Sequence, residues 1–201
     1  DRVYESTQQS AEIAIAHRFK GGEKTFVVGS LWPEDLEVLA PFINEHRHSL
    51  KFILAPHEIS EKFITQIEQV LSVKTIRYSR VQATENLEPY SVLIIDNIGM
   101  LSTLYRYGEF AFVGGAYGKG LHNILEAACY GIPILFGDQN YLKFQEAREL
   151  IMRGGAFAIS GYTDLKKTFE LLTNKPESFL LACEVTQSYV KENLGATTKI
   201  V

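Results

Sequence analysis

The stretch FVGGAYGKGLHNILEAACYGIPILFG, residues 112–137, decides the fold that this chain is expected to adopt. It contains six of the fifteen glycines, and four of them lie between Gly114 and Gly120, directly after an apolar run. Glycine lets backbone N–H groups crowd around an anion, and a following helix directs its positive end to the same point. The stretch therefore predicts a strand, a phosphate-holding loop that includes Gly115 and Gly120, and a helix.

The rest of the chain repeats this alternation of strand and helix. Nearly all the predicted strands are apolar throughout, which is typical of a parallel sheet covered on both faces. The pattern predicts one Rossmann-like α/β domain over residues 1–201. The expected strands are 24–30, 51–55, 75–78, 91–95, 109–113, 133–136 and 156–160, and the expected helices are 3–19, 33–46, 60–71, 100–107, one ending at 130, 144–152, 163–172 and 176–194.

Composition and charge exclude several classes of protein. A length of 201 residues allows one sizeable core, and a net charge of −4 without a basic run gives no reason to expect a nucleic-acid partner. Two cysteines, Cys129 and Cys183, in helix-like contexts are expected to be reduced thiols, which suits a cytoplasmic protein. The five histidines show no metal-ligand spacing, so we predict neither a metal nor a cofactor.

Polar residues follow the predicted strands where a Rossmann-like fold binds its ligand. Such ligands lie at the carboxyl ends of the strands, which here means Ser30, His57, Asp96 and the loop 114–123. Ser30 offers a hydroxyl and nearby N–H groups to a phosphate, and a helix cap is the alternative. His57 lines the cleft or lies in a surface turn.

The end of the glycine loop carries four further candidates. Lys119 and His122 could both face an anion, or they could belong to a solvated loop. Asn123 and Glu126 form an N-x-x-E pattern, which is explained by helix capping or by a carboxylate that takes the two hydroxyls of a ribose. A tight strand-to-helix turn remains the alternative for the loop as a whole.

Four blocks in the same order resemble the 3-deoxy-D-manno-octulosonic acid (Kdo) transferases of Gram-negative lipopolysaccharide synthesis. The run AFVGGAYGKGLHNILEAACYGIPILFG looks like the donor-binding signature of that family. The other blocks are VVGSLWPED, ILAPHE and IIDNIGMLSTLYRYGEFAFVGG. The resemblance covers roughly residues 1–195 and implies the second of two Rossmann-like lobes, a GT-B fold, with the N-terminal acceptor domain absent from this chain.

The resemblance also implies a reaction, which is the inverting transfer of Kdo from CMP-Kdo to a lipid A precursor at the cytoplasmic face of the inner membrane. It places Ser30, His122 and Asn123 against phosphate or the Kdo carboxylate and Glu126 against the ribose. Lys119 and Met100 depart from the family, which commonly carries a glutamate at the latter position. The family's catalytic base belongs to the missing lobe, so this chain is expected to bind donor without turnover.

Two other functions remain open. The first is a UDP-sugar transferase or UDP-sugar 2-epimerase, which also combines a glycine loop with a carboxylate that binds the ribose. The second is a non-catalytic nucleotide-binding module. The chain starts at Asp1 in a helical pattern, and we expect it to be a fragment of a longer protein. Apolar residues of the last helix are expected to pack on its own sheet, with an exposed patch as the alternative.

Overall fold

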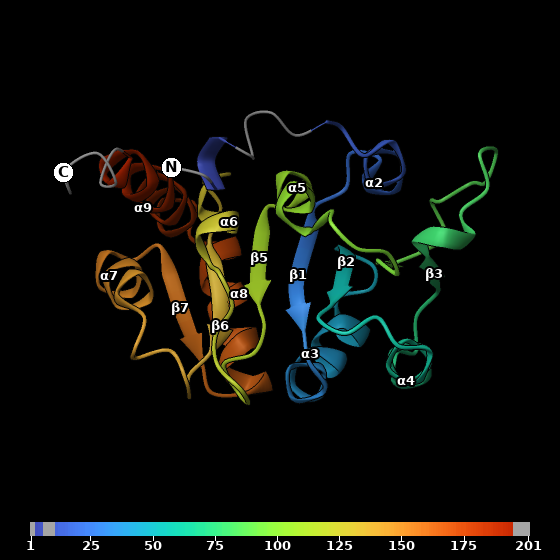
Figure 1. Ribbon diagram of the computed structural model, residues 1–201, viewed down its shortest axis with the longest axis horizontal. Helices are drawn as coiled ribbons and strands as arrows, with labels where there is room; N and C mark the ends of the chain where they lie inside the picture. The colour runs from blue at the N-terminus through green and yellow to red at the C-terminus, as the bar shows by residue number, and fades with distance from the viewer. Residues whose placement is uncertain (1–2, 6–10, 195–201) are drawn as a thin grey trace.

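The computed structural model describes residues 3–5 and 11–194 and shows seven parallel strands in one sheet, in the order β3-β4-β2-β1-β5-β6-β7. The strand arrows point toward one edge, with helices in front of and behind the sheet (Figure 1). The predicted Rossmann-like class is confirmed. The strands are β1 Thr25–Leu31, β2 Lys51–Pro56, β3 Thr75–Arg77, β4 Val92–Ile94, β5 Phe110–Val113, β6 Ile134–Gly137 and β7 Ala156–Ile159.

The helices agree with the predicted ones with several exceptions. They are α2 Ala14–Lys20, α3 Pro33–Glu45, α4 Glu61–Val70, α5 Leu101–Leu104, α6 Leu125–Ala128, α7 Gln145–Arg153, α8 Tyr162–Asn174 and α9 Pro176–Asn193, with 3₁₀ turns η1 Tyr78–Arg80 and η2 Tyr105–Tyr107. The predicted helix over 3–19 is wrong as a single element, because 11–13 are not helical and 6–10 lie outside the described residues. Ile13 is extended and its N–H donates to the Tyr107 hydroxyl at 2.7 Å.

Side chains alternate between two hydrophobic clusters, one on each face of the sheet. From β1, Val27 packs on the face covered by α2, α5, α6 and α7, and its neighbours Phe26 and Val28 pack on the face covered by α3, α4 and α8. Such continuous burial explains why the strands read as unbroken apolar runs. Within the described residues no helix is long and apolar enough to cross a bilayer.

The last helix, α9, contributes to both clusters. Ala182 packs with α8 on one face, and Tyr189 and Val190 pack on the other. Leu180 and Leu181 stay 58% and 51% exposed. The preferred prediction, packing on its own sheet, is therefore confirmed for the buried side of α9, whereas these two leucines face outward.

The two cysteines do not form a disulfide, and both are half-buried on helices or their ends. Burial raises the pKa of the Cys183 thiol, which makes this thiol a weak nucleophile at neutral pH.

Candidate functional site

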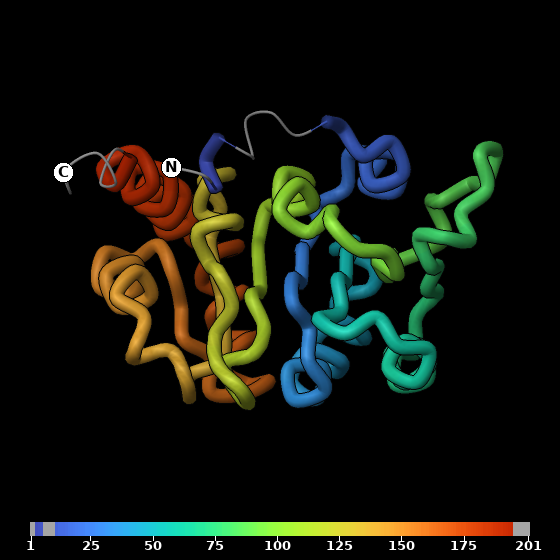
Figure 2. The backbone as a smooth tube through the Cα atoms, in the orientation of Figure 1, coloured from blue at the N-terminus to red at the C-terminus, as the bar shows by residue number. Residues whose placement is uncertain are grey.

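The order of the strands places a topological switch point, where open α/β sheets form a crevice, between β1 and β5. These strands are neighbours, yet the connection after β1 runs through α3 on one face and the connection after β5 runs through α6 on the other. Such a topological switch point is where open α/β sheets bind ligands. The loops after β1 and β5 reach the same edge of the molecule (Figure 2). The predicted binding edge therefore gathers Ser30 and the glycine loop.

Ser30 stands at the β1 side of this crevice in a strained conformation. Its φ of 51° makes it the one non-glycine residue with positive φ within the described parts of the chain. A Cβ atom added at Gly114 would lie 2.2 Å from the Ser30 carbonyl oxygen, so the two backbones approach closely only because residue 114 is glycine. Left-handed backbone at a non-glycine residue is concentrated at functional sites.

Most glycine N–H groups of the loop hold the loop itself. Gly115 N donates to Asp35 Oδ2 at 3.0 Å, and the N–H groups of Gly118 and Gly120 both donate to the Gly115 carbonyl, at 3.0 and 2.9 Å. The left-handed φ values of Gly115 and Gly120, 98° and 134°, allow this tight turn. This differs from the prediction that these N–H groups point at an anion.

Other backbone N–H groups of the loop have no acceptor within the described residues, among them those of Ala116, Tyr117 and Lys119 and two later in the loop. His122 N donates to the Gly114 carbonyl at 3.2 Å, whereas the backbone N–H groups of Asn123 and Ile124 meet no acceptor within the described residues. The helix that follows, α6, has only four residues, so its dipole contributes less than the sequence suggested. An anion at this edge would meet the N–H groups of residues 123 and 124.

The N-x-x-E pattern forms the capping contact that the sequence left as one alternative. Asn123 Oδ1 accepts from the N–H of Leu125 at 3.1 Å, and its Nδ2 donates to Glu126 Oε1 at 3.4 Å. Glu126 is half-buried, and burial raises the pKa of its carboxyl group. Burial raises the pKa of Tyr105, and the charge of Glu126 raises it further, which places the two side chains near each other. Glu126 thus lies deeper than the exposed Asn123.

Three predicted residues meet around Trp32. The His57 ring stacks on the indole at a centroid distance of 4.3 Å, and Lys119 Nζ lies 4.6 Å from the ring centroid. The indole Nε1 donates to His122 Nε2 at 2.8 Å, and the two imidazoles are 4.4 Å apart. Trp32 was not among the predicted residues, although a lone tryptophan directly after a strand end was the available signal.

Asp35 was missed as well, and it joins α3 to the glycine loop. Its side chain is 0% exposed, and Oδ2 accepts from the N–H of Trp32 at 2.9 Å and from the N–H of Gly115. Oδ1 is buried and has no hydrogen-bond partner within the described residues. Burial raises the pKa of this carboxyl to about 6 against the opposing effect of the two N–H donors. Because an acid in a first helical turn is common, these hydrogen bonds of Asp35 could not be predicted from its position in the sequence.

A hollow of about 180 Å³ adjoins the crevice between the ends of β1, β2 and β4. Ser30 and His57 line it together with Ile95 and residues 97–99. Asp96 does not line it, because its carboxylate accepts from the N–H of Ser79 at 2.8 Å and from the Ser79 hydroxyl. Asp96 therefore fixes the loop after β3 instead of joining the site.

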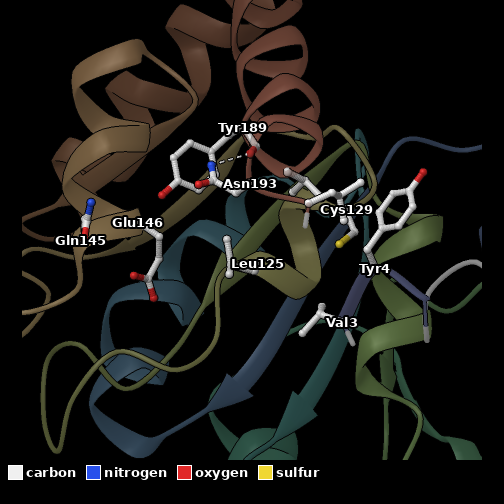
Figure 3. Close-up of a pocket in the computed structure, with 10 residues that line it drawn as sticks. Val3, Tyr4, Leu125, Cys129, Gln145, Glu146, Tyr189 and Asn193 are labelled. Atoms are coloured by element: carbon white, nitrogen blue, oxygen red, sulfur yellow. Dashed lines mark hydrogen bonds between the residues drawn. The ribbon is translucent and has the colours of Figure 1, made fainter. Parts of the chain in front are cut away.

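A separate pocket of about 270 Å³ lies between α6, α7, α9 and the segment 3–5 (Figure 3). Leu125 of α6 and Cys129, directly after this helix, line it. Tyr189 and Asn193 of α9 line it as well, and Asn193 Nδ2 donates to the Tyr189 carbonyl at 2.8 Å. None of the eight site residues predicted from the sequence lines this pocket. The crevice at the strand ends remains the candidate site, because there polar groups and backbone N–H groups converge.

Comparisons with known proteins agree with this geometry, although no family model matches the chain. The fold is that of one lobe of a GT-B type glycosyltransferase. It superposes with a TM-score of 0.72 on a crystal structure described as the C-terminal CMP-Kdo binding domain of WaaA from Acinetobacter baumannii, with 23% identity over 93% of this chain and 97% of that one. It also superposes on a putative UDP-N-acetylglucosamine 2-epimerase from Listeria monocytogenes, with a TM-score of 0.65 and 15% identity over 99% of this chain and 50% of that one.

By sequence, the chain is a relative of the 3-deoxy-D-manno-octulosonic acid transferases. It is 31% identical to the protein of that name from Chlamydophila psittaci over 153 residues, which are 75% of this chain and 35% of the relative. It is 34% identical to the Aquifex aeolicus protein over 158 residues, 75% of this chain and 42% of the relative. The chain thus spans well under half the length of these relatives, and the resemblance stated from the four sequence blocks is confirmed.

Proposed function

We propose that this chain is the donor-binding domain of a Kdo transferase and holds CMP-Kdo in the crevice between β1 and β5. One observation carries this proposal. At the switch point, Ser30 and the end of the glycine loop converge with Trp32 and the side chains around it, His57, Lys119 and His122. The names of its relatives and of its structural neighbour supply the identity of the donor.

The anionic part of the donor would lie at the outer end of the crevice. The N–H groups of Asn123 and Ile124 offer hydrogen bonds there, and Lys119 and His122 offer further donors close by. Ser30 adds its hydroxyl from the opposite side. This arrangement suits a phosphate or a carboxylate, because both are bound by several N–H and O–H donors.

Glu126 would accept hydrogen bonds from the ribose hydroxyls. Its Oε1 takes only the long 3.4 Å contact from Asn123, and no described residue donates to Oε2. A half-buried carboxylate with spare acceptor positions suits a vicinal diol. His57, in the wall of the adjoining hollow, would contact the donor from the β2 side.

In the complete protein the domain would stabilise the departing phosphate of CMP while Kdo passes, with inversion, to a hydroxyl of a lipid A precursor. Positive charge and fixed N–H donors lower the energy of a leaving group that gains charge. The base that deprotonates the acceptor would come from the first lobe. A lipid acceptor would place the complete enzyme at the cytoplasmic face of the inner membrane.

Calorimetric titration of this chain with CMP and with UDP tests the proposal. We expect CMP to bind more tightly, and we expect Glu126→Ala to lower CMP affinity about 10- to 100-fold, since hydrogen bonds to a charged group contribute about 1.5–3 kcal/mol. Glu170→Ala, on the exposed side of α8, is the matched control and should leave affinity unchanged. UDP binding as tight as that of CMP would instead favour the UDP-sugar enzymes that share this fold.

A further inference from the structure

Trp32 connects α3 to the glycine loop through two different donors. It is the N-cap residue of α3, and its backbone N–H donates to Asp35 Oδ2 at 2.9 Å. Its indole Nε1 lies 2.8 Å from His122 Nε2, across 90 residues of sequence. The planes of the indole and the His122 ring are nearly parallel, with an interplanar angle of 11° and centroids 6.1 Å apart. The indole N–H therefore donates to a ring nitrogen of His122.

The chemistry of the two rings decides which nitrogen of His122 carries the proton. An indole N–H can only donate, so His122 Nε2 must accept and cannot hold a proton. The ring is then neutral, with its hydrogen on Nδ1. Within the described part of the chain no acceptor lies against this Nδ1–H group, which leaves it available to a ligand.

The surroundings of the His122 ring favour the same neutral state. Burial lowers the pKa of His122, and the neighbouring His57 lowers it further. Lys119 lies over the indole of Trp32 and adds a positive charge beside these rings. A second proton on His122 would both break the Trp32 hydrogen bond and add a charge beside these groups.

We propose that Trp32 is a positioning residue that holds His122 in the neutral Nδ1–H tautomer, so that this N–H is the hydrogen-bond donor offered to the anionic part of a bound sugar nucleotide. The ligand side of this inference rests on the proposed function, whereas the tautomer is a property of the protein alone. The positive charge at the site then comes from Lys119, whereas the neutral His122 contributes a directed hydrogen-bond donor.

The test compares wild type with Trp32→Phe, which keeps an aromatic ring for His57 to stack on and removes the N–H donor. The ¹⁵N chemical shifts of the histidine side chains in the ligand-free protein report which ring nitrogen is protonated. We expect His122 to carry its proton on Nδ1 in wild type. In Trp32→Phe we expect a mixture of tautomers and a higher pKa for His122, because the hydrogen bond that favours the neutral ring is lost.

His46 provides a control within the same spectrum. Its Nδ1 lies 2.9 Å from the Phe42 carbonyl oxygen at the other end of α3, so it must also carry its proton on Nδ1. The His46 signals should be the same in both proteins. A change at His46 would show that the substitution disturbs α3 as a whole.

Titration with CMP above the pKa of His122 completes the test. If the Nδ1–H tautomer falls to about one fifth in Trp32→Phe, the dissociation constant should rise about fivefold. In a His122→Ala background the same substitution should have little further effect.

A wild-type His122 that is charged or carries its proton on Nε2 would overturn the inference whatever CMP does. The expected change in tautomer without a change in CMP affinity would overturn the ligand role alone. Failure of wild type to bind CMP would instead count against the proposed function and remove the ligand role with it, while the tautomer result stands.

Discussion

Ser30 combines a strained backbone with a position at the crevice. The left-handed region costs a residue with a Cβ atom about 1–2 kcal/mol, and φ at Ser30 is 51°. Strain of this kind persists where the surrounding structure fixes it, here through the close approach of Gly114. Ser30 therefore adopts a left-handed backbone conformation that a residue with a Cβ atom disfavours.

Two substitutions separate the role of the Ser30 side chain from the cost of its backbone. Ser30→Gly should raise the free energy of unfolding by roughly 0.5–1 kcal/mol, because relief of strain exceeds the added flexibility of the unfolded chain. Ser30→Ala keeps the strain and should not stabilise the protein. Both should weaken CMP binding. Urea denaturation and calorimetry measure the two effects, and unchanged CMP affinity in both variants would exclude a role for the hydroxyl.

At the scale of elements, Asp35 determines how α3 meets the loop after β5. One carboxylate oxygen receives N–H groups from both segments, and the other is buried without a partner in the described structure. The raised pKa, about 6 instead of 3.8, means that the folded state binds a proton more readily than the unfolded state does. The contribution of this group to stability is thus full below about pH 4 and is lost as pH rises through 6.

This linkage predicts a pH dependence that a single substitution removes. A shift of about two pKa units corresponds to about 3 kcal/mol of unfolding free energy lost between pH 4 and pH 7. Asp35→Asn keeps the shape and cannot ionise, so the difference in stability between variant and wild type should move in favour of the variant by about that amount over this range. Urea denaturation at several pH values measures it, with Glu37→Gln on the exposed side of α3 as control. A difference independent of pH would contradict the assignment.

For the whole molecule, α9 decides whether this chain has one closed core. Its buried residues reach both clusters, and Phe179 contacts Phe110 of β5 with ring centroids 5.4 Å apart. The helix is therefore an integral part of the domain. Its outward leucines, Leu180 and Leu181, carry little of that stabilisation.

Truncation of the chain after Lys175 should abolish cooperative unfolding, because it exposes the apolar surface that Ala182, Tyr189 and Val190 now cover. The double substitution Leu180→Gln and Leu181→Gln changes only half-exposed positions and should alter stability by less than about 1 kcal/mol. Thermal unfolding followed by circular dichroism distinguishes the two. A truncated chain that still unfolds cooperatively would show that α9 is dispensable.

Much of the site follows from residues that are close in the sequence. The apolar run before Gly114 predicted β5, and the polar residues after strand ends predicted Ser30 and His57 at one edge. Trp32 and Asp35 could not be assigned in this way, because their partners His122 and Gly115 lie 90 and 80 residues away. Asp96 shows the converse error, since a position at a strand end did not reveal that Ser79 occupies its carboxylate.

The sequence by itself determined the Rossmann-like class, the position of Ser30, His57 and the glycine loop at one edge of the sheet and the relationship to Kdo transferases, because apolar periodicity and the glycine-rich signature are local properties of the chain. Only the tertiary structure decided what the glycine N–H groups do and which residues surround His122. Hydrogen bonds between distant segments depend on how the sheet brings them together. The fold thus turns the N–H groups of Gly115, Gly118 and Gly120 inward, onto the loop itself and onto Asp35.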